Sequence, residues 1–305
     1  MKSLYREYRP KSFAEVIGQD HITKTIQNQI KADRISHAYL FCGTRGTGKT
    51  TVAKILAKTL TSEIDTFEID AASNNSVQDV REIVDRVKYP PVVGKYKVYI
   101  IDEVHMFSGS AFNAILKTLE EPPSYVVFIL CTTEPHKLLP TVQSRCLRFD
   151  FRAVSTENIS KLLTKILKKE NVTVTTEAVL SLAGAACGSV RDALSYAETA
   201  MNYCGGKEIT ASDVATILGT VDDKILKSLY DAIVAKKTND IKKIVDKIFQ
   251  SGINTNMLVK NFISVIANEN VGQIFKTFCE LETNIKNSLD PKSHFENACL
   301  VAAVG

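Results

Sequence analysis

The stretch Gly43-Thr44-Arg45-Gly46-Thr47-Gly48-Lys49-Thr50 decides the fold of this chain. It follows the apolar run Ala38-Tyr39-Leu40-Phe41-Cys42 and opens a helical pattern, so a G-x-x-x-x-G-K-T motif stands between a predicted strand and a predicted helix. The glycines let the backbone wrap with its N–H groups pointing inward, and the helix N-terminus adds unpaired donors. This arrangement fits a polyphosphate; the alternative is an ordinary glycine-rich turn.

The side chains of this loop suit the parts of a bound nucleoside triphosphate. Lys49 supplies a positive charge for the outer phosphates, and Thr50 supplies a hydroxyl for a magnesium ion. We therefore predict that the loop binds a polyphosphate together with Mg²⁺; that this polyphosphate is ATP is implied only by the family resemblance described below. The residues expected to bind the nucleotide here are Gly43, Thr44, Gly46, Thr47, Gly48, Lys49, Thr50 and Thr51.

Two carboxylates follow a second apolar run, Lys97-Val98-Tyr99-Ile100-Ile101-Asp102-Glu103. A strand buried on both faces of a parallel sheet has a continuous apolar sequence, and ligands of open α/β sheets bind at the carboxyl ends of the strands. Asp102 is suited to the magnesium shell, and Glu103 is suited to orient and deprotonate the attacking water. The alternative is a surface acidic pair of no special function.

A third apolar run, residues 125–131, ends at Thr132-Thr133. If its strand neighbours the one that carries Asp102, the Thr133 hydroxyl reaches the γ-phosphate or the water beside Glu103. Otherwise, Thr133 is an ordinary residue at a strand end. Strands and helices alternate from about residue 37 to residue 151, which predicts an α/β fold with one doubly wound parallel sheet.

Helical periodicity replaces the apolar runs from Ser155 onward. Helices are expected at 157–168, 177–186, 225–234, 241–249 and 257–267, with further helix to the end. Ser189 is expected to cap another helix, whose first turn contains Arg191. An arginine there opposes the helix dipole unless an anion is near, so Arg191 is either a phosphate-sensing residue or a salt-bridged surface residue.

The N-terminal segment leaves one alternative open. A helix is expected from about Asp20 to Arg34, with Asp20 as its N-cap. Before this helix, Arg9-Pro10 is either an exposed turn or the wall of a pocket for the nucleotide base.

Composition restricts the class of protein. The chain has 45% hydrophobic and 24% charged residues, as in an ordinary globular protein, and its net charge of +4 is too small to indicate nucleic-acid binding unless the site is local. The seven cysteines are isolated, with no C-x-x-C pair and no signal peptide before them, so we expect reduced, buried thiols in a cytoplasmic protein. No apolar run is long enough to span a bilayer.

Taken together, the motifs resemble the gamma/tau family of bacterial DNA polymerase III clamp-loader subunits. The matching fragments are YREYRPKSF, GQDH, HAYLFCGTRGTGKTT, EIDAASN, IDEVHMFS, FNAILKTLEEPP, TTEP, SRC, GSVRDALS and LGTVDD. The match is dense over about residues 1–222 and weaker to the end. The resemblance implies an AAA+ ATPase fold with three domains: a nucleotide-binding domain (1–153), a helical lid (154–219) and a helical collar (220–305) that forms a pentameric ring.

The resemblance also implies residue roles. Lys49 and Thr50 correspond to Walker A, Asp102 and Glu103 to Walker B, Thr133 to sensor 1, Arg191 to sensor 2, and Arg145 of Ser-Arg-Cys to an arginine finger that reaches the γ-phosphate bound by the adjacent subunit. Arg9, Pro10, Val16 and Ile17 would wall the adenine pocket. Asn74, Ser76, Arg81 and Lys117 match DNA-backbone contacts, of which only the last two are basic.

The chain departs from the family pattern in two places. The family usually inserts a four-cysteine zinc module before EIDAAS, but only Thr61–Thr66 stand there in this chain, so no zinc site is expected. The collar is short near Asn268 to Gly272. We also expect no tau-like tail for polymerase or helicase binding after Gly305.

The leading hypothesis is an ATP-driven motor that opens a sliding clamp and closes it on primer–template DNA. Its expected partners are other clamp-loader subunits in a hetero-pentameric ring, the clamp and the DNA, with no membrane. A non-hydrolysing structural subunit of the same ring is one alternative, disfavoured by the intact set of Lys49, Thr50, Asp102, Glu103 and Arg145. Another AAA+ DNA remodeller, such as a Holliday-junction motor, is disfavoured by Ser-Arg-Cys and the three-part layout.

Overall fold

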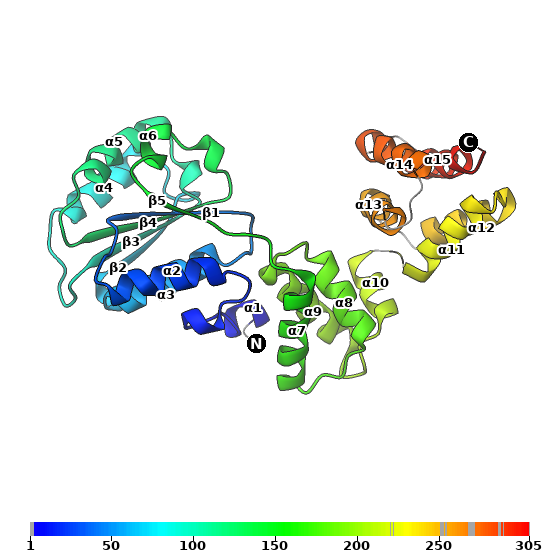
Figure 1. The fold of residues 1–305 in the computed structure, drawn as a ribbon, viewed down its shortest axis with the longest axis horizontal. Helices are drawn as coiled ribbons and strands as arrows, with labels where there is room; N and C mark the ends of the chain where they lie inside the picture. The colour runs from blue at the N-terminus through cyan, green and yellow to red at the C-terminus, as the bar shows by residue number, and fades with distance from the viewer. Residues whose placement is uncertain are drawn as a thin grey trace. The chain divides into compact units, whose positions relative to one another are not determined.

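Five strands form one parallel sheet in the computed structural model of the protein (Figure 1). In the order β2-β3-β4-β1-β5, each pair of neighbours is parallel. The strands are β1 (Ala38–Cys42), β2 (Thr66–Asp70), β3 (Lys97–Asp102), β4 (Val126–Thr132) and β5 (Leu147–Asp150). Every residue of β1 and β4 is buried, which explains their continuous apolar sequences. The predicted doubly wound parallel sheet is confirmed.

Helices cover both faces of this sheet (Figure 1). One face packs against α4 (Val77–Val87) and α5 (Gly109–Glu120), and the other packs against α2 (Asp20–Lys31) and α3 (Lys49–Leu60). Successive side chains of β1 alternate between these two cores. Burial on both sides fixes the strands, and the strands in turn fix the loops at their carboxyl ends.

The structure describes residues 3–219, 221, 223–250, 253, 255–267, 272–285, 288 and 290–304. The chain divides into two compact units, Met1–Ile166 with Ala183–Ser195 and Leu167–Leu182 with Tyr196–Gly305. The division into three domains stays a prediction. The collar is expected to be short near Asn268 to Gly272, and residues 268–271 of this region lie outside the described residues.

Short elements and further helices complete the described chain. The short elements are α1 (Leu4–Glu7), η1 (Phe13–Glu15), η2 (Glu63–Asp65), η3 (Val104–Met106), η4 (Pro135–Lys137) and α6 (Pro140–Gln143). The later helices are α7 (Thr156–Lys169), α8 (Thr176–Ala185), α9 (Val190–Cys204), α10 (Ala211–Leu218), α11 (Asp223–Val234), α12 (Thr238–Gln250), α13 (Thr255–Ile266), α14 (Gly272–Asn284) and α15 (Pro291–Val304). The expected helical second half is confirmed.

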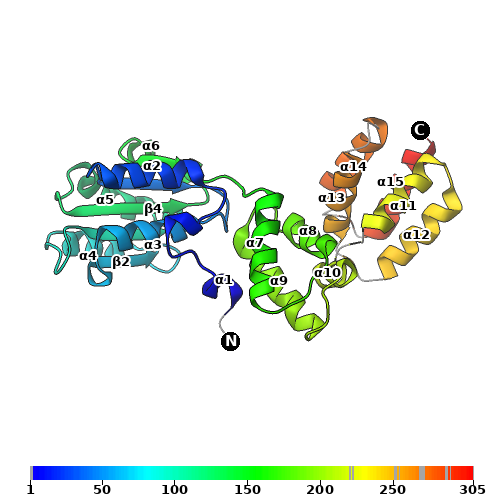
Figure 2. The ribbon, with the colours of Figure 1, turned by 60° about the horizontal axis from the view of Figure 1, so that its bottom comes forward.

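Helices α11 to α15 share one apolar core. Figure 2 shows α11, α12 and α15 side by side. At the centre of this core, the ring of Phe278 lies 4.6 Å from that of Phe262 and 5.7 Å from that of Phe295, both edge to face. No helix among the described residues is long and apolar enough to cross a membrane.

Of the two helix caps that the sequence predicts, Ser189 is confirmed and Asp20 is not. Ser76 and Asp79 form a capping box at the start of α4, and the Ser189 Oγ accepts the backbone N–H of Asp192 in α9 at 3.2 Å. Asp20 is wrong as an N-cap, because α2 begins at Asp20 and the cap position falls on Gln19, which makes no side-chain cap bond. The Gln19 side chain is instead buried and bonded to distant backbone groups.

All seven cysteines are free thiols, as predicted. Their burial differs: Cys42, Cys131 and Cys299 are buried, but Cys187 is exposed, so the prediction of uniformly buried thiols is wrong. Cys187 lies in the turn between α8 and α9 and has a positive φ of 47°, a backbone conformation that is typical of turns.

Asp65 is a buried carboxylate in the segment Thr61–Thr66, which stands where the family usually has its zinc module. Asp65 accepts backbone N–H groups from Val92 at 2.6 Å and from Val93 and Gly94 at 2.9 Å. Burial by itself raises the pKa of the Asp65 carboxyl, but these backbone hydrogen bonds outweigh it and leave the pKa below its ordinary value. The ionised carboxylate therefore stabilises the folded state.

We expect Asp65→Asn to lower the free energy of unfolding by about 1–3 kcal/mol, because the amide cannot accept all three N–H groups. Since the folded pKa is lowered, this stabilisation is present at neutral pH and is lost as the pH falls through the folded pKa. Thermal unfolding at pH 7 and at acidic pH tests it, with Asp85→Asn, which removes only an exposed pair with Lys88, as control. Equal melting temperatures of the Asp65 variant and wild type at pH 7 would contradict this role.

Candidate active site

The phosphate loop lies between β1 and α3 and packs against the start of α9. Gly46 and Gly48 have φ angles of 78° and 104°, which glycine adopts most readily. The backbone O of Gly46 accepts the N–H of Val190 at 3.1 Å, and a Cβ on Gly46 would lie 2.0 Å from the Oγ of Ser189. The loop therefore needs glycine at this position both for its curvature and for the approach of α9.

Lys49 is 5% exposed and points into the phosphate loop. Its Nζ donates to the backbone O of Gly43 at 2.8 Å and to that of Thr44 at 2.9 Å. Burial lowers the pKa of Lys49 below its ordinary value, and the nearby charge of Glu103 offsets part of that shift. A polyphosphate in the loop would give this desolvated ammonium group an anionic partner.

Thr50 and Asp102 meet across the site, although they are far apart in sequence. The Thr50 Oγ1 donates to the Asp102 Oδ2 at 2.8 Å, at the point where α3 begins and β3 ends. A hydroxyl and a carboxylate are the hard oxygen ligands that Mg²⁺ takes, usually together with phosphate oxygens and water. The pair therefore fits the predicted metal role.

Glu103 and Thr133 are joined directly. Strands β3 and β4 are neighbours, which confirms the condition on which the Thr133 prediction rested. The Glu103 Oε2 accepts the Thr133 hydroxyl at 3.0 Å and the Thr133 backbone N–H at 3.3 Å. Glu103 itself has a positive φ of 48°, which is uncommon for a residue with a side chain and is found at functional sites.

Arg191 lies at the same edge of the sheet. It stands in the first turn of α9, and its Cβ would be 3.3 Å from a Cβ on Gly46 of the phosphate loop. Its guanidinium group lies over the ring of Tyr5, 4.9 Å from the centroid, which is a cation–π geometry. The first turn of α9 thus brings Arg191 beside the loop that would hold phosphates.

The N-terminal segment also reaches the phosphate loop. The Arg9 Nε donates to the Thr51 Oγ1 at 3.1 Å, at the start of α3. Pro10 and Ile17 are half-buried, and Val16 is buried. Arg9-Pro10 is therefore not a fully exposed turn, and its role as a wall of the base pocket stays a prediction.

Arg145 is paired within its own chain. Its Nη2 lies 2.7 Å from the Glu120 Oε1, and its Nη1 donates to the backbone O of Thr141 at 2.7 Å. The side chain is 34% exposed. To reach the γ-phosphate bound by an adjacent subunit, as expected, the Arg145 guanidinium has to leave Glu120 or to contact Glu120 and the phosphate together.

The four candidate DNA contacts lie on α4, α5 and the loop before α4. Arg81 and Lys117 are exposed on these two helices, which pack against each other. The amide of Asn74 donates to the backbone O of Asp70, and the Ser76 hydroxyl is used in the capping box. The basic pair is thus exposed to solvent on the surface of α4 and α5, whereas the side chains of the neutral pair have local partners.

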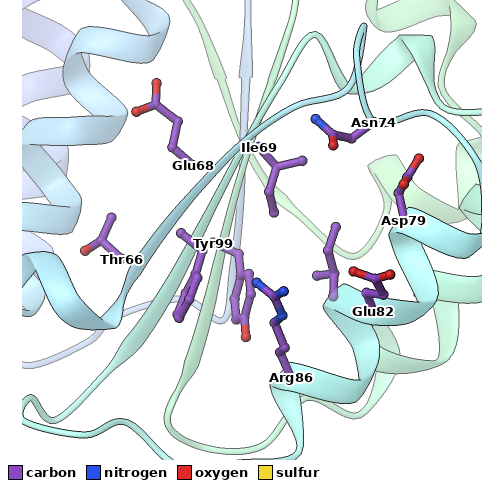
Figure 3. A pocket seen from close by; sticks show the side chains of 10 residues that line it. Thr66, Glu68, Ile69, Asn74, Asp79, Glu82, Arg86 and Tyr99 are labelled. Atoms are coloured by element: carbon purple, nitrogen blue, oxygen red, sulfur yellow. The ribbon is translucent and has the colours of Figure 1, made fainter.

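A shallow cavity of about 330 Å³ opens between β2 and α4 beside these residues (Figure 3). Asn74 and Asp79 stand at one end of it, and Arg86 lies beside the ring of Tyr99 at the other. Burial raises the pKa of Tyr99 to about 12. The cavity is separate from the phosphate loop, so we assign it no part in nucleotide binding.

Gln19 contacts the phosphate loop, although no sequence motif predicts a role for its side chain. It is fully buried; its Nε2 donates to the backbone O of Thr47 at 3.3 Å and of Arg152 at 2.7 Å, and its Oε1 accepts the Arg152 N–H. The side chain thus ties the phosphate loop to the chain that leaves β5. Its only signal was its place in the GQDH fragment.

The described residues contain no group of three or more His, Cys, Asp or Glu side chains that could hold a metal ion. We expect the purified protein, without nucleotide, to carry no stoichiometric zinc and to melt at the same temperature with and without chelator. Elemental analysis and thermal unfolding test this. Stoichiometric zinc, with a lower melting temperature after chelation, would contradict it.

A parallel sheet in the order β2-β3-β4-β1-β5, a phosphate loop after β1, acidic residues after β3 and a threonine after β4 define a P-loop protein with the AAA+ fold. Solved structures agree with this fold. The Holliday junction branch migration motor RuvB of Thermotoga maritima superposes with a TM-score of 0.59 and 18% identity, over 87% of this chain and 92% of that chain.

Sequence comparisons define the family. Residues 18–75 and 64–155 match the model of the DNA polymerase III delta subunit, and residues 158–206 match the ATPase lid domain of the DNA polymerase III clamp loader subunit. DNA polymerase III subunit gamma of Buchnera aphidicola is 37% identical over 294 residues, covering 89% of this chain and 81% of the relative. The chain belongs to the gamma/tau family of DNA polymerase III clamp-loader subunits.

The relatives differ in length. DNA polymerase III subunit tau of Bacillus subtilis is 43% identical over 288 residues, which is 86% of this chain but 50% of the relative. The chain thus spans about half the length of this relative, and less of several others.

Proposed function

We propose that the chain is an ATP-hydrolysing motor subunit of a clamp loader, which opens a sliding clamp and loads it on primer–template DNA. The observation that carries this proposal is the convergence of Lys49, Thr50, Asp102, Glu103 and Thr133 on one edge of the sheet. Its partners would be the other subunits of a hetero-pentameric ring, the clamp and the DNA. The gamma/tau family membership supports these partners.

Each residue has a chemical task in this proposal. The phosphate loop and Lys49 bind the β- and γ-phosphates, and Thr50 and Asp102 hold Mg²⁺, which when bound neutralises charge on the phosphates. Thr133 and Arg191 sense the γ-phosphate, and Glu103 orients and deprotonates the attacking water. Arg9, Pro10, Val16 and Ile17 would surround the adenine.

Arg145 and the DNA contacts complete the proposal beyond a single chain. Arg145 would act on the nucleotide of the neighbouring subunit, and Arg81 and Lys117 would contact the DNA phosphates, supported by their exposure on α4 and α5. No zinc is needed for any step. Mg²⁺-dependent release of phosphate from ATP by the purified protein tests the enzymatic part; absence of turnover in the assembled ring would refute it.

A further inference from the structure

A histidine without an assigned role lies beside Glu103. His105 stands in the turn η3 after β3, and its side chain is only 6% exposed. Its Nδ1 lies 3.0 Å from the Thr132 Oγ1 and 3.4 Å from the Glu103 Oε2, and its Nε2 lies 3.2 Å from the Glu134 Oε2. The imidazole therefore bridges the end of β3 to the end of β4.

The contacts of Glu103 leave one oxygen for chemistry. The Thr133 hydroxyl, the Thr133 backbone N–H and the His105 Nδ1 all lie against Oε2. Partners on one oxygen restrict rotation of the carboxylate, and they leave the lone pairs of Oε1 for a proton from water. This restriction matters because the side chain of Glu103 is 34% exposed and would otherwise sample several rotamers.

The imidazole is itself held from its far side. A carboxylate only accepts hydrogen bonds, so the ring joins Glu103 to Glu134 when both of its nitrogens carry a hydrogen, Nδ1 toward the Glu103 Oε2 and Nε2 toward the Glu134 Oε2. Lys137 pairs with the same Oε2 of Glu134 at 2.8 Å, and mainly through this hydrogen bond the pKa of Glu134 stays below its ordinary value. Glu134 is thus an ionised anchor that fixes the plane of the ring.

On the basis of the proposed ATPase function, we propose that His105 is a positioning residue, which holds the Glu103 carboxylate in place at the ends of β3 and β4. It does not touch the nucleotide; it acts through Glu103. The structural alternative is a buried histidine that stabilises the η3 turn and has no effect on the reaction.

The kinetics of three substitutions separate these two roles. We expect His105→Ala to lower kcat about 10- to 100-fold, because a misplaced general base loses reactive geometry. The KM and the Kd for ATP should change less than about twofold, because the contacts of His105 in the described part of the chain are with Thr132, Glu103 and Glu134 and not with the phosphate loop. His105→Asn, which keeps a polar atom near the Nδ1 position, should recover kcat by several-fold over Ala, whereas His105→Gln, which reaches the Nε2 position, should recover less.

His136→Ala is the matched control, since His136 is 73% exposed and lies 4.0 Å from Glu134 without approaching Glu103; its kcat should equal that of wild type. A wild-type kcat in His105→Ala would overturn the inference. So would equal losses in the Ala, Asn and Gln variants that follow a common fall in melting temperature. If wild-type rings hydrolyse no ATP, the proposed function itself fails; if they do and Glu103→Gln does not, the failure of a His105 effect concerns this inference alone.

Discussion

Glu103→Gln is expected to bind ATP with nearly unchanged affinity and to hydrolyse it at least about 10²–10⁴-fold more slowly, the usual contribution of a general base. The amide of glutamine keeps the size of the side chain and can still accept the Thr133 hydroxyl, which donates to Glu103 at 3.0 Å. It cannot take a proton from water. Nucleotide affinity and single-turnover hydrolysis, measured on the same preparation, separate binding from chemistry.

Lys49→Ala should behave differently, with loss of nucleotide binding itself. This change removes the buried ammonium group of the phosphate loop, which now donates to Gly43 and Thr44. Lys54→Ala, which removes a lysine of the same helix paired with Glu68, is the control and should bind ATP normally. Near-normal turnover by Glu103→Gln would refute the general-base assignment, and tight ATP binding by Lys49→Ala would refute that of the phosphate loop.

Arg145→Ala is expected to leave ATP affinity of an isolated subunit intact and to lower hydrolysis in the assembled ring by about 10³-fold or more, as for loss of an arginine finger. Within its own chain, Arg145 contacts Glu120 and Thr141 and no phosphate-loop residue among those described. If this exposed ion pair were its only role, substitution would cost at most about 1 kcal/mol of stability.

Glu120→Gln is the matched control for Arg145. It removes the same ion pair but keeps the guanidinium, so ring hydrolysis should stay near the wild-type rate. Rings that mix Arg145→Ala with Glu103→Gln subunits add a test of action in trans, because some interfaces then combine an intact Glu103 with an intact Arg145. Equal losses in the Glu120 and Arg145 variants, or activity independent of assembly, would count against the finger.

The sheet and the phosphate loop could be predicted because their signals are local. Continuous apolar runs predict strands buried on both faces, and the polar side chains after them predict the edge where ligands bind. Ser76 could be predicted as a cap because a capping box is read within four residues. The N-cap of α2 could not be predicted in this way. It is Gln19 and not Asp20, and the Gln19 side chain bonds to the backbone of Arg152, which is distant in sequence.

The rest of the site depends on contacts between distant segments. Asp65 contacts the backbone of Val92, 27 residues away in sequence, and Gln19 contacts that of Arg152, 133 residues away. His105 has no local feature that distinguishes it from any histidine after a strand; its position between Glu103 and Glu134 follows from the pairing of β3 with β4. Arg145 was assigned by resemblance alone, and the ion pair with Glu120 could not be read from the sequence.

One measurement tests most directly whether this chain is the motor of a clamp loader. ATP turnover is measured for the assembled ring alone, with sliding clamp, and with sliding clamp plus primer–template DNA, using Glu103→Gln rings as the blank. For a clamp-loader motor, we expect turnover that rises several-fold only when clamp and primed DNA are both present and that disappears in the blank. Turnover that is absent, or equal in all three mixtures, would contradict it.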